Sequence, residues 1–198
     1  MPAADTIHDV TAANPEPTPL RRHALPVSGG HVIAVQEWGL ADGIAAVVLH
    51  GGPGSGSSPL LRRGFDLSRY RAISIDQRGA GASTPRGGID DNTLDNLLDD
   101  LRLVREALGV HQWLVVGGSW GATLAVVHAA AEPQAVSALL LRSAFLARHE
   151  DIDWFFQGAA AEQPQAWQRL ASIAQQDERG ALLPCLQRML REGTAAQQ

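Results

Sequence analysis

The sequence contains no lysine and only one cysteine, and these absences exclude several kinds of protein. All 16 basic residues are arginines, against 21 acidic residues, so the formal net charge is −5. Arginines adjoin only at Arg21-Arg22 and Arg62-Arg63, which leaves no basic face for nucleic-acid binding. Without lysine there is no phosphate-binding P-loop. Cys185 cannot form a disulfide within the chain, which fits a reducing compartment such as the cytoplasm. Its apolar, helical surroundings predict a packing residue.

Long apolar runs are also lacking. No stretch approaches the roughly 18 apolar residues of a membrane-spanning helix, so we expect no membrane association. Residues 1–19 have neither the basic segment nor the apolar segment of a signal peptide, and we expect a flexible tail there. The hydrophobic content of 45% is ordinary for a globular protein. We expect no cofactor and no metal, because the motifs described below need neither.

From residue 20 onward, short apolar runs alternate with helical patterns. The predicted strands are 31–39, 44–52, 70–79, 111–118 and 135–143, and the predicted helices are 94–109 and 120–133. This alternation predicts an α/β fold with a mostly parallel sheet and flanking helices on both faces. Beyond residue 144 the pattern is helical, with no further strand. We therefore predict a core over 20–143 and a separate helical part over 144–198.

The stretch VVGGSWGATLA contains a serine in a tight turn between a strand and a helix. Its centre reads G-x-S-x-G, with Gly117, Gly118, Ser119, Trp120 and Gly121 in order. In this context the motif predicts a nucleophile elbow, a strained turn that lifts the serine hydroxyl clear of the sheet. Side chains two residues before and after the serine would clash, which explains the glycines. The following amide and the helix N-terminus then face developing negative charge.

A second motif, HGGPG, directly follows another predicted strand. Its glycines allow backbone amides to approach a ligand, and an oxyanion hole needs one such donor beside the serine. We predict Gly52 as that donor, with Gly51 as the alternative. His50, Pro53 and Gly54 are expected to frame the loop, although His50 could also pass for a catalytic base.

A third motif, DQRGAGAS, follows the strand at 70–79. We predict that Asp76 and Arg78 pair and brace the loops beside the serine. Nucleotide binding has little support here, because no G-x-G-x-x-G pattern occurs.

Together, the motifs resemble the proline iminopeptidase family of α/β-hydrolases. The matching stretches are HGGPG, DQRGAGAST, GGSWGATLA and, for the start of that family's helical cap, LLLRSAFLARHEDIDWFFQGAAAEQPQAW. The likeness covers roughly residues 20–170. It implies an α/β-hydrolase fold and removal of an N-terminal proline from a peptide. Ser119 would be the nucleophile, and Gly52 and Trp120 the oxyanion donors.

The acid and histidine that should follow the serine in this fold are not evident. His128 lies nine residues along the same predicted helix, about 13.5 Å from the serine at 1.5 Å per residue, so we expect a packing histidine. His149 could lie at the sheet edge, yet only Glu132 precedes it as an acid. The resemblance places the family's acid and histidine after the cap, so we expect this chain to be C-terminally incomplete and inactive alone.

The resemblance also implies that carboxylates of the cap grip the substrate's free amino group. Glu150, Asp151 and Asp153 are candidates, although a solvated helix start explains them better. Without its last strands the sheet would expose an apolar edge, which predicts self-association. Two alternatives stay open. One is an esterase or amidase that acts on a small ester or amide, and the other is a non-catalytic protein with the same fold.

Overall fold

The computed structural model describes residues 18–173 and 182–192. The predicted tail over residues 1–19 lies almost wholly outside these ranges. The chain divides into two compact units, Met1–Ala144 and Phe145–Gln198, and each is described by itself.

The first unit is built on a six-stranded sheet in the order β1-β2-β4-β3-β5-β6. The strands are β1 (Arg21–Pro26), β2 (Val32–Gly39), β3 (Ile44–Leu49), β4 (Tyr70–Asp76), β5 (Trp113–Gly118) and β6 (Val136–Arg142). The run from β4 through β3 and β5 to β6 is parallel, while β1 and β2 are antiparallel to their neighbours. The prediction of a mostly parallel sheet is confirmed. Strand β1, which we did not predict, pairs with β2 across a turn in which Gly29 and Gly30 both have positive φ.

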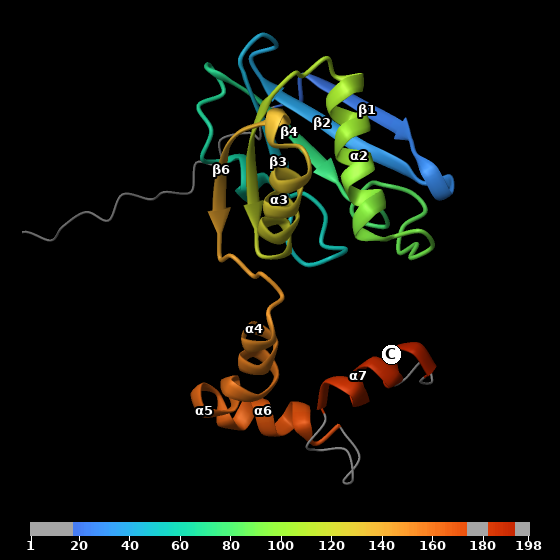
Figure 1. Ribbon diagram of the computed structural model, residues 1–198, viewed down its shortest axis with the longest axis vertical. Coiled ribbons are helices and arrows are strands. Elements are labelled where there is room, and N and C mark those ends of the chain that lie inside the picture. The colour runs from blue at the N-terminus through green and yellow to red at the C-terminus, as the bar shows by residue number, and fades with distance from the viewer. Residues whose placement is uncertain (1–17, 174–181, 193–198) are drawn as a thin grey trace, which may run out of the picture. The chain divides into compact units, whose positions relative to one another are not determined.

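Two helices cover one face of this sheet, as Figure 1 shows: α2 (Leu94–Ala107) and α3 (Trp120–Ala131). Helix α2 begins where the Thr93 hydroxyl accepts a hydrogen bond from the amide of Asn96. Its apolar residues recur at helical spacing, so they enter one core with alternate residues of the strands and with the inner side of α3. The core consists of Ile33, Val35, Val47, Leu49, Ile73, Ile75, Leu97, Leu101, Val104, Leu108, Val110, Trp113, Val115, Leu124 and Ala125.

The opposite face carries the alternate residues of the same strands, because side chains alternate along a strand. Ala46, Val48 and Ala72 are fully buried there, as both faces of a parallel sheet usually are. The short helix α1 (Pro59–Arg62) contributes the guanidinium of Arg62, which lies 3.6 Å from the centre of the Trp38 ring. The central strands of the sheet are therefore packed on both sides.

Strand β6 lies at the edge of the sheet and is poorly covered. Leu139, Leu140 and Leu141 are 40%, 47% and 38% exposed. Within the described ranges, no strand pairs with the outer edge of β6. This edge presents the free backbone groups and apolar side chains that we expected from the sequence.

The regular secondary structure in the described part of the second unit is all helical. It contains α4 (His149–Asp153), a π-helical turn (Trp154–Gly158), α5 (Ala159–Glu162), α6 (Pro164–Ala171) and α7 (Leu182–Glu192). Cys185 of α7 is 2% exposed and its sulfur lies 3.9 Å from that of Met189, which confirms it as a packing residue. Among the described helices of both units, none is long and apolar enough to cross a bilayer.

Candidate active site

Ser119 stands at a strained point of the backbone between β5 and α3. Its φ of 53° and ψ of −121° are unusual for a residue with a side chain. Its own amide donates to the carbonyl of Arg142, and its carbonyl accepts from the amide of Ala122 at 2.9 Å. The residue is exposed. The turn therefore has the sharp strand-to-helix geometry of a nucleophile elbow.

The glycines on either side of the elbow are required by close backbone packing. A Cβ on Gly121 would lie 2.2 Å from the carbonyl oxygen of Leu49, and one on Gly117 would lie 2.2 Å from that of Gly121. Neither contact can be relieved by rotating a side chain, because the opposing atoms belong to the backbone. Helix α3 can therefore start directly against the end of β3 only when both positions lack a side chain.

The HGGPG loop lies against this elbow. A Cβ on Gly51 would be 2.8 Å from the carbonyl oxygen of Gly118 and 3.1 Å from the Cβ of Ser119. Gly52 adopts a φ of +42°, and its carbonyl accepts from the amide of Ser55, which closes the loop into a turn. The loop and the serine, nearly 70 residues apart in sequence, are thus brought into contact at the carboxyl ends of β3 and β5.

His50 is held inside the loop as a neutral ring. The amide of Gln77 donates to His50 Nε2 at 3.0 Å, so the proton resides on Nδ1, which lies 3.0 Å from the carbonyl oxygen of Gly51. The side chain is fully buried, and this burial lowers the pKa of His50 below its ordinary value. With both nitrogens engaged by the loop, His50 is a framing residue and is not placed to act as a base for Ser119.

Asp76 braces the next loop against the HGGPG loop. Its carboxylate accepts from the amide of Ser57 at 2.6 Å and from the amide of Ala82 at 2.8 Å. A Cβ on Gly81 would lie 2.3 Å from the Asp76 carboxyl carbon, so this position must be glycine. The predicted bracing role of Asp76 agrees with these contacts.

The expected pair between Asp76 and Arg78 is wrong. Arg78 instead forms a two-pronged ion pair with Asp100 of α2, at 2.6 and 2.8 Å, and also donates to the carbonyl and hydroxyl oxygens of Ser28. Both charged groups are almost fully buried. Burial raises the pKa of Asp100 even though Arg78 opposes the shift. Arg78 therefore fixes the loop to α2 and to the β1–β2 turn.

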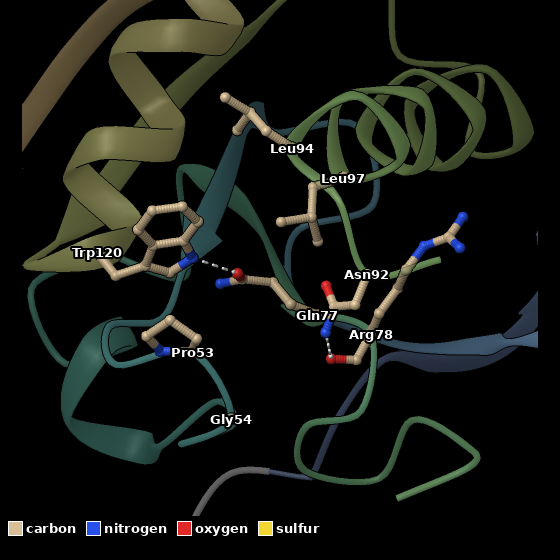
Figure 2. Close-up of a pocket in the computed structure, with 8 residues that line it drawn as sticks. All are labelled: Pro53, Gly54, Gln77, Arg78, Asn92, Leu94, Leu97 and Trp120. Carbon is tan, nitrogen blue, oxygen red and sulfur yellow. Dashed lines mark hydrogen bonds between the residues drawn. The ribbon is translucent and has the colours of Figure 1, made fainter. Parts of the chain in front are cut away.

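A cavity of about 230 Å³ lies beside the elbow, between the two loops and the start of α2 (Figure 2). Its walls are mostly apolar, with the indole of Trp120 on one side. The lining residues are Pro53, Gly54, Gln77, Arg78, Asn92, Leu94, Leu97 and Trp120. Pro53 and Gly54, which we predicted to frame the HGGPG loop, thus form one wall of this cavity.

The histidines of the first unit's described part are engaged away from Ser119. His128 is fully buried, and its Nε2 accepts from the indole of Trp113 at 3.1 Å, so it is a packing histidine as expected. His23 contacts Glu37, His31 contacts the carbonyl of Asp90, and His111 precedes β5 at the end opposite the serine. The candidate acid Glu132 pairs with Arg105 at 3.0 Å instead.

His149 and the three acidic candidates belong to the second unit. Glu150, Asp151 and Asp153 lie in α4. The Asp151 carboxylate accepts from the backbone amides of Leu146 and Arg148, and its hydrogen bond with the Arg148 side chain lowers the pKa of Asp151. Asp151 therefore stabilises the beginning of α4. A substrate-binding role for these carboxylates stays a prediction.

Two parts of the site were not found from the sequence. Gln77 bridges the HGGPG loop and the elbow by hydrogen bonds to His50 and Trp120, and Asp100 is the partner of Arg78. Gln77 directly follows Asp76 at the carboxyl end of β4, where the site lies, and this position could have indicated a role in the site. Across residues 18–173 and 182–192, no three His, Cys, Asp or Glu side chains gather as metal ligands.

Comparison with known proteins adds a family match. The sequence model of a protein family, described as alpha/beta hydrolase fold, matches residues 46–192 of this chain. The chain is 45% identical over 160 residues to a proline iminopeptidase from Arabidopsis thaliana, covering 80% of this chain and 42% of that relative. It is 40% identical over 177 residues to a proline iminopeptidase from Xylella fastidiosa strain 9a5c, covering 89% of this chain and 56% of that relative.

A solved structure has the same fold. The proline iminopeptidase-related protein from Thermus thermophilus superimposes with a TM-score of 0.60 at 28% identity, covering 87% of this chain and 58% of that one. The chain spans about half the length of the curated relatives it matches, at 42% and 56% of the two described above.

Proposed function

Because the chain belongs to the α/β-hydrolase fold family, we propose that it carries the nucleophile and the oxyanion hole of a serine hydrolase that removes N-terminal proline from peptides. The observation that carries this proposal is the backbone at Ser119, whose positive φ is adopted without glycine and lifts an exposed hydroxyl above the sheet. The choice of N-terminal proline is supported by the identity of 40–45% to curated relatives of that name.

In the proposed reaction the Ser119 oxygen attacks the carbonyl carbon of the substrate. A C–O bond forms, and the carbonyl electron pair moves onto the oxygen. The Trp120 amide is available to bind this oxyanion, because the first amides of a helix have no acceptor within it. We propose the Gly52 amide as the second donor, with Gly51 as the alternative. The serine proton must pass to a base, and within the described core no histidine is placed to take it.

We therefore expect a residual reaction in this chain, with solvent as the base. Removing a triad member typically leaves about 10³- to 10⁴-fold acceleration over water, from the oxyanion hole and binding alone. An activated ester such as p-nitrophenyl acetate should then acylate Ser119 slowly but measurably. We also propose a reducing location such as the cytoplasm, which the single buried cysteine supports.

The test combines covalent labelling with substrate comparison. In the natural gene product a fluorophosphonate probe should label Ser119 and should not label the S119A variant, as read by mass spectrometry of the labelled peptide, whereas labelling of the 198-residue chain alone would mean that it already holds an activating base. The natural gene product should hydrolyse proline p-nitroanilide faster than short acyl esters. Faster turnover of the esters would favour an esterase of this fold. No labelling and no turnover would favour a non-catalytic protein, an alternative that the absence of a base near Ser119 in the described core also supports.

A further inference from the structure

The two halves of the proposed oxyanion hole come from loops that have no covalent connection near the site. One donor belongs to the HGGPG loop after β3, and the other is the amide of Trp120 at the start of α3. Their spacing must be held within about 0.5 Å for the oxyanion to bind both. Backbone packing of Gly51 against Gly118 brings the two loops together, and a side chain that hydrogen-bonds to both can fix their spacing.

Gln77 makes that connection through its side-chain amide. Its Nε2 donates to the carbonyl oxygen of His50 at 2.9 Å, and its Oε1 accepts from the indole Nε1 of Trp120 at 3.0 Å. Figure 2 shows the Gln77 side chain extending toward the Trp120 ring across the cavity. The same residue's backbone amide donates to His50 Nε2, so three hydrogen bonds converge on this position.

The environment of Gln77 makes these bonds strong and directional. The residue is only 5% exposed, and a buried amide that loses its partners is costly. Its side-chain Nε2 donates to the HGGPG loop at His50, and its Oε1 accepts from the elbow at Trp120. An amide side chain is required for this arrangement, because a carboxylate offers no donor to His50 and an apolar side chain offers neither group.

We propose that Gln77 is a positioning residue that sets the distance between the Gly52 and Trp120 amides, through the His50 carbonyl on one side and the Trp120 indole on the other. Its side-chain amide is engaged by His50 and Trp120, so it acts through these two residues. This inference rests on the proposed serine hydrolase function. Its effect should appear where the oxyanion forms, in the transition state, and not in binding of a neutral ester.

The experiment uses the 198-residue chain and p-nitrophenyl acetate, with kcat and KM measured for each variant. Q77L removes both hydrogen bonds, and Q77E keeps the acceptor for the indole while losing the donor. We expect kcat to fall about 10- to 100-fold in Q77L, since small displacements of oxyanion donors have effects of this order. KM should stay within about twofold of the wild-type value.

N96L is the matched control. The Asn96 amide also donates once, to the Asp91 carbonyl at 2.7 Å, and accepts once, from the Ser28 hydroxyl at 3.3 Å, but Asn96 is not among the residues that line the cavity beside the elbow. We expect its kcat to stay within about twofold of wild type even where its melting temperature falls as much as that of Q77L. Circular dichroism shows whether each variant folds, and Q77E takes the place of Q77L if Q77L does not.

A double-mutant cycle with W120F tests the path of the effect. If Gln77 acts through the indole, Q77L should cost less in the W120F background than in the wild type. Equal kcat values for Q77L and N96L, an effect confined to KM, or full additivity with W120F would each overturn the role of Gln77. The S119A variant separates the two proposals: unchanged turnover in S119A defeats the serine hydrolase proposal itself, whereas inactive S119A with a fully active Q77L defeats only the Gln77 assignment.

Discussion

Replacing Gly121 by alanine tests whether the elbow is as tightly packed as the structure shows. The new Cβ would lie 2.2 Å from the Leu49 carbonyl oxygen and 2.7 Å from that of His50, so α3 would have to move away from the end of β3. Such overpacking costs about 1–3 kcal/mol. The cost should appear even though alanine is intrinsically better than glycine inside a helix by roughly 1 kcal/mol.

Gly118 provides the control within the same turn. Nothing lies within 4 Å of a Cβ built on Gly118, and its φ is not in the left-handed region. G118A should therefore be neutral or stabilising by about 0.4–1 kcal/mol, through the lower entropy of the unfolded chain. The two variants should differ by about 1–4 kcal/mol in the free energy of unfolding.

Urea denaturation followed by circular dichroism measures this difference. With a slope of about 2 kcal/mol per molar urea, the midpoint of G121A should lie roughly 0.5–2 M below that of G118A. Equal midpoints would refute the reasoning, because they would mean that the Gly121 backbone does not approach the end of β3 as closely as the structure shows.

Three further predictions concern charge and surface. Burial lowers the pKa of His50 and His128 below 6.5, so the unfolded chain takes up more protons than the folded chain as the pH falls. The urea midpoint should therefore stay constant above pH 6.5 and drop toward about pH 5, and it should drop less in H128Q. A flat pH profile would contradict this prediction. D100N leaves the buried Arg78 charge unpaired and should lower the free energy of unfolding in urea by about 3–5 kcal/mol. D99N, at the neighbouring exposed residue, should lower it little. Equal losses of free energy in the two variants would be inconsistent with the buried pair. If β6 mediates self-association, L140K should lower the molecular mass found by light scattering. L60K, which changes another exposed leucine, should not lower it. Identical masses in both variants would exclude the β6 edge as the surface of self-association.

The sequence predicted the parallel part of the fold well, because buried parallel strands are apolar along their whole length and α2 shows a clear helical period. It missed β1, whose residues include Arg21, Arg22 and Pro26. An edge strand needs to be apolar on one side only, and β1 is mostly exposed with no buried residue, so its composition provided no signal. The four-residue helix α1 is too short for any periodic pattern.

The elbow was predictable because its geometry demands particular residue types at fixed offsets from Ser119. The partner of Arg78 was not, since Asp100 lies 22 residues away on a helix whose rotation the sequence does not specify. The role of Gln77 was hidden for a related reason. One of its two side-chain partners is a backbone carbonyl, and every residue has one.

We propose that Ser119 projects beside two amides that can bind an oxyanion. A crystal structure of the natural gene product after reaction with a small fluorophosphonate shows whether these amides bind the adduct. We predict a phosphonyl group on Ser119 Oγ, with its free oxygen within about 2.7–3.1 Å of the amide nitrogens of Gly52 and Trp120. An adduct at Ser119 whose oxygen points into solvent, away from both amides, would contradict the account.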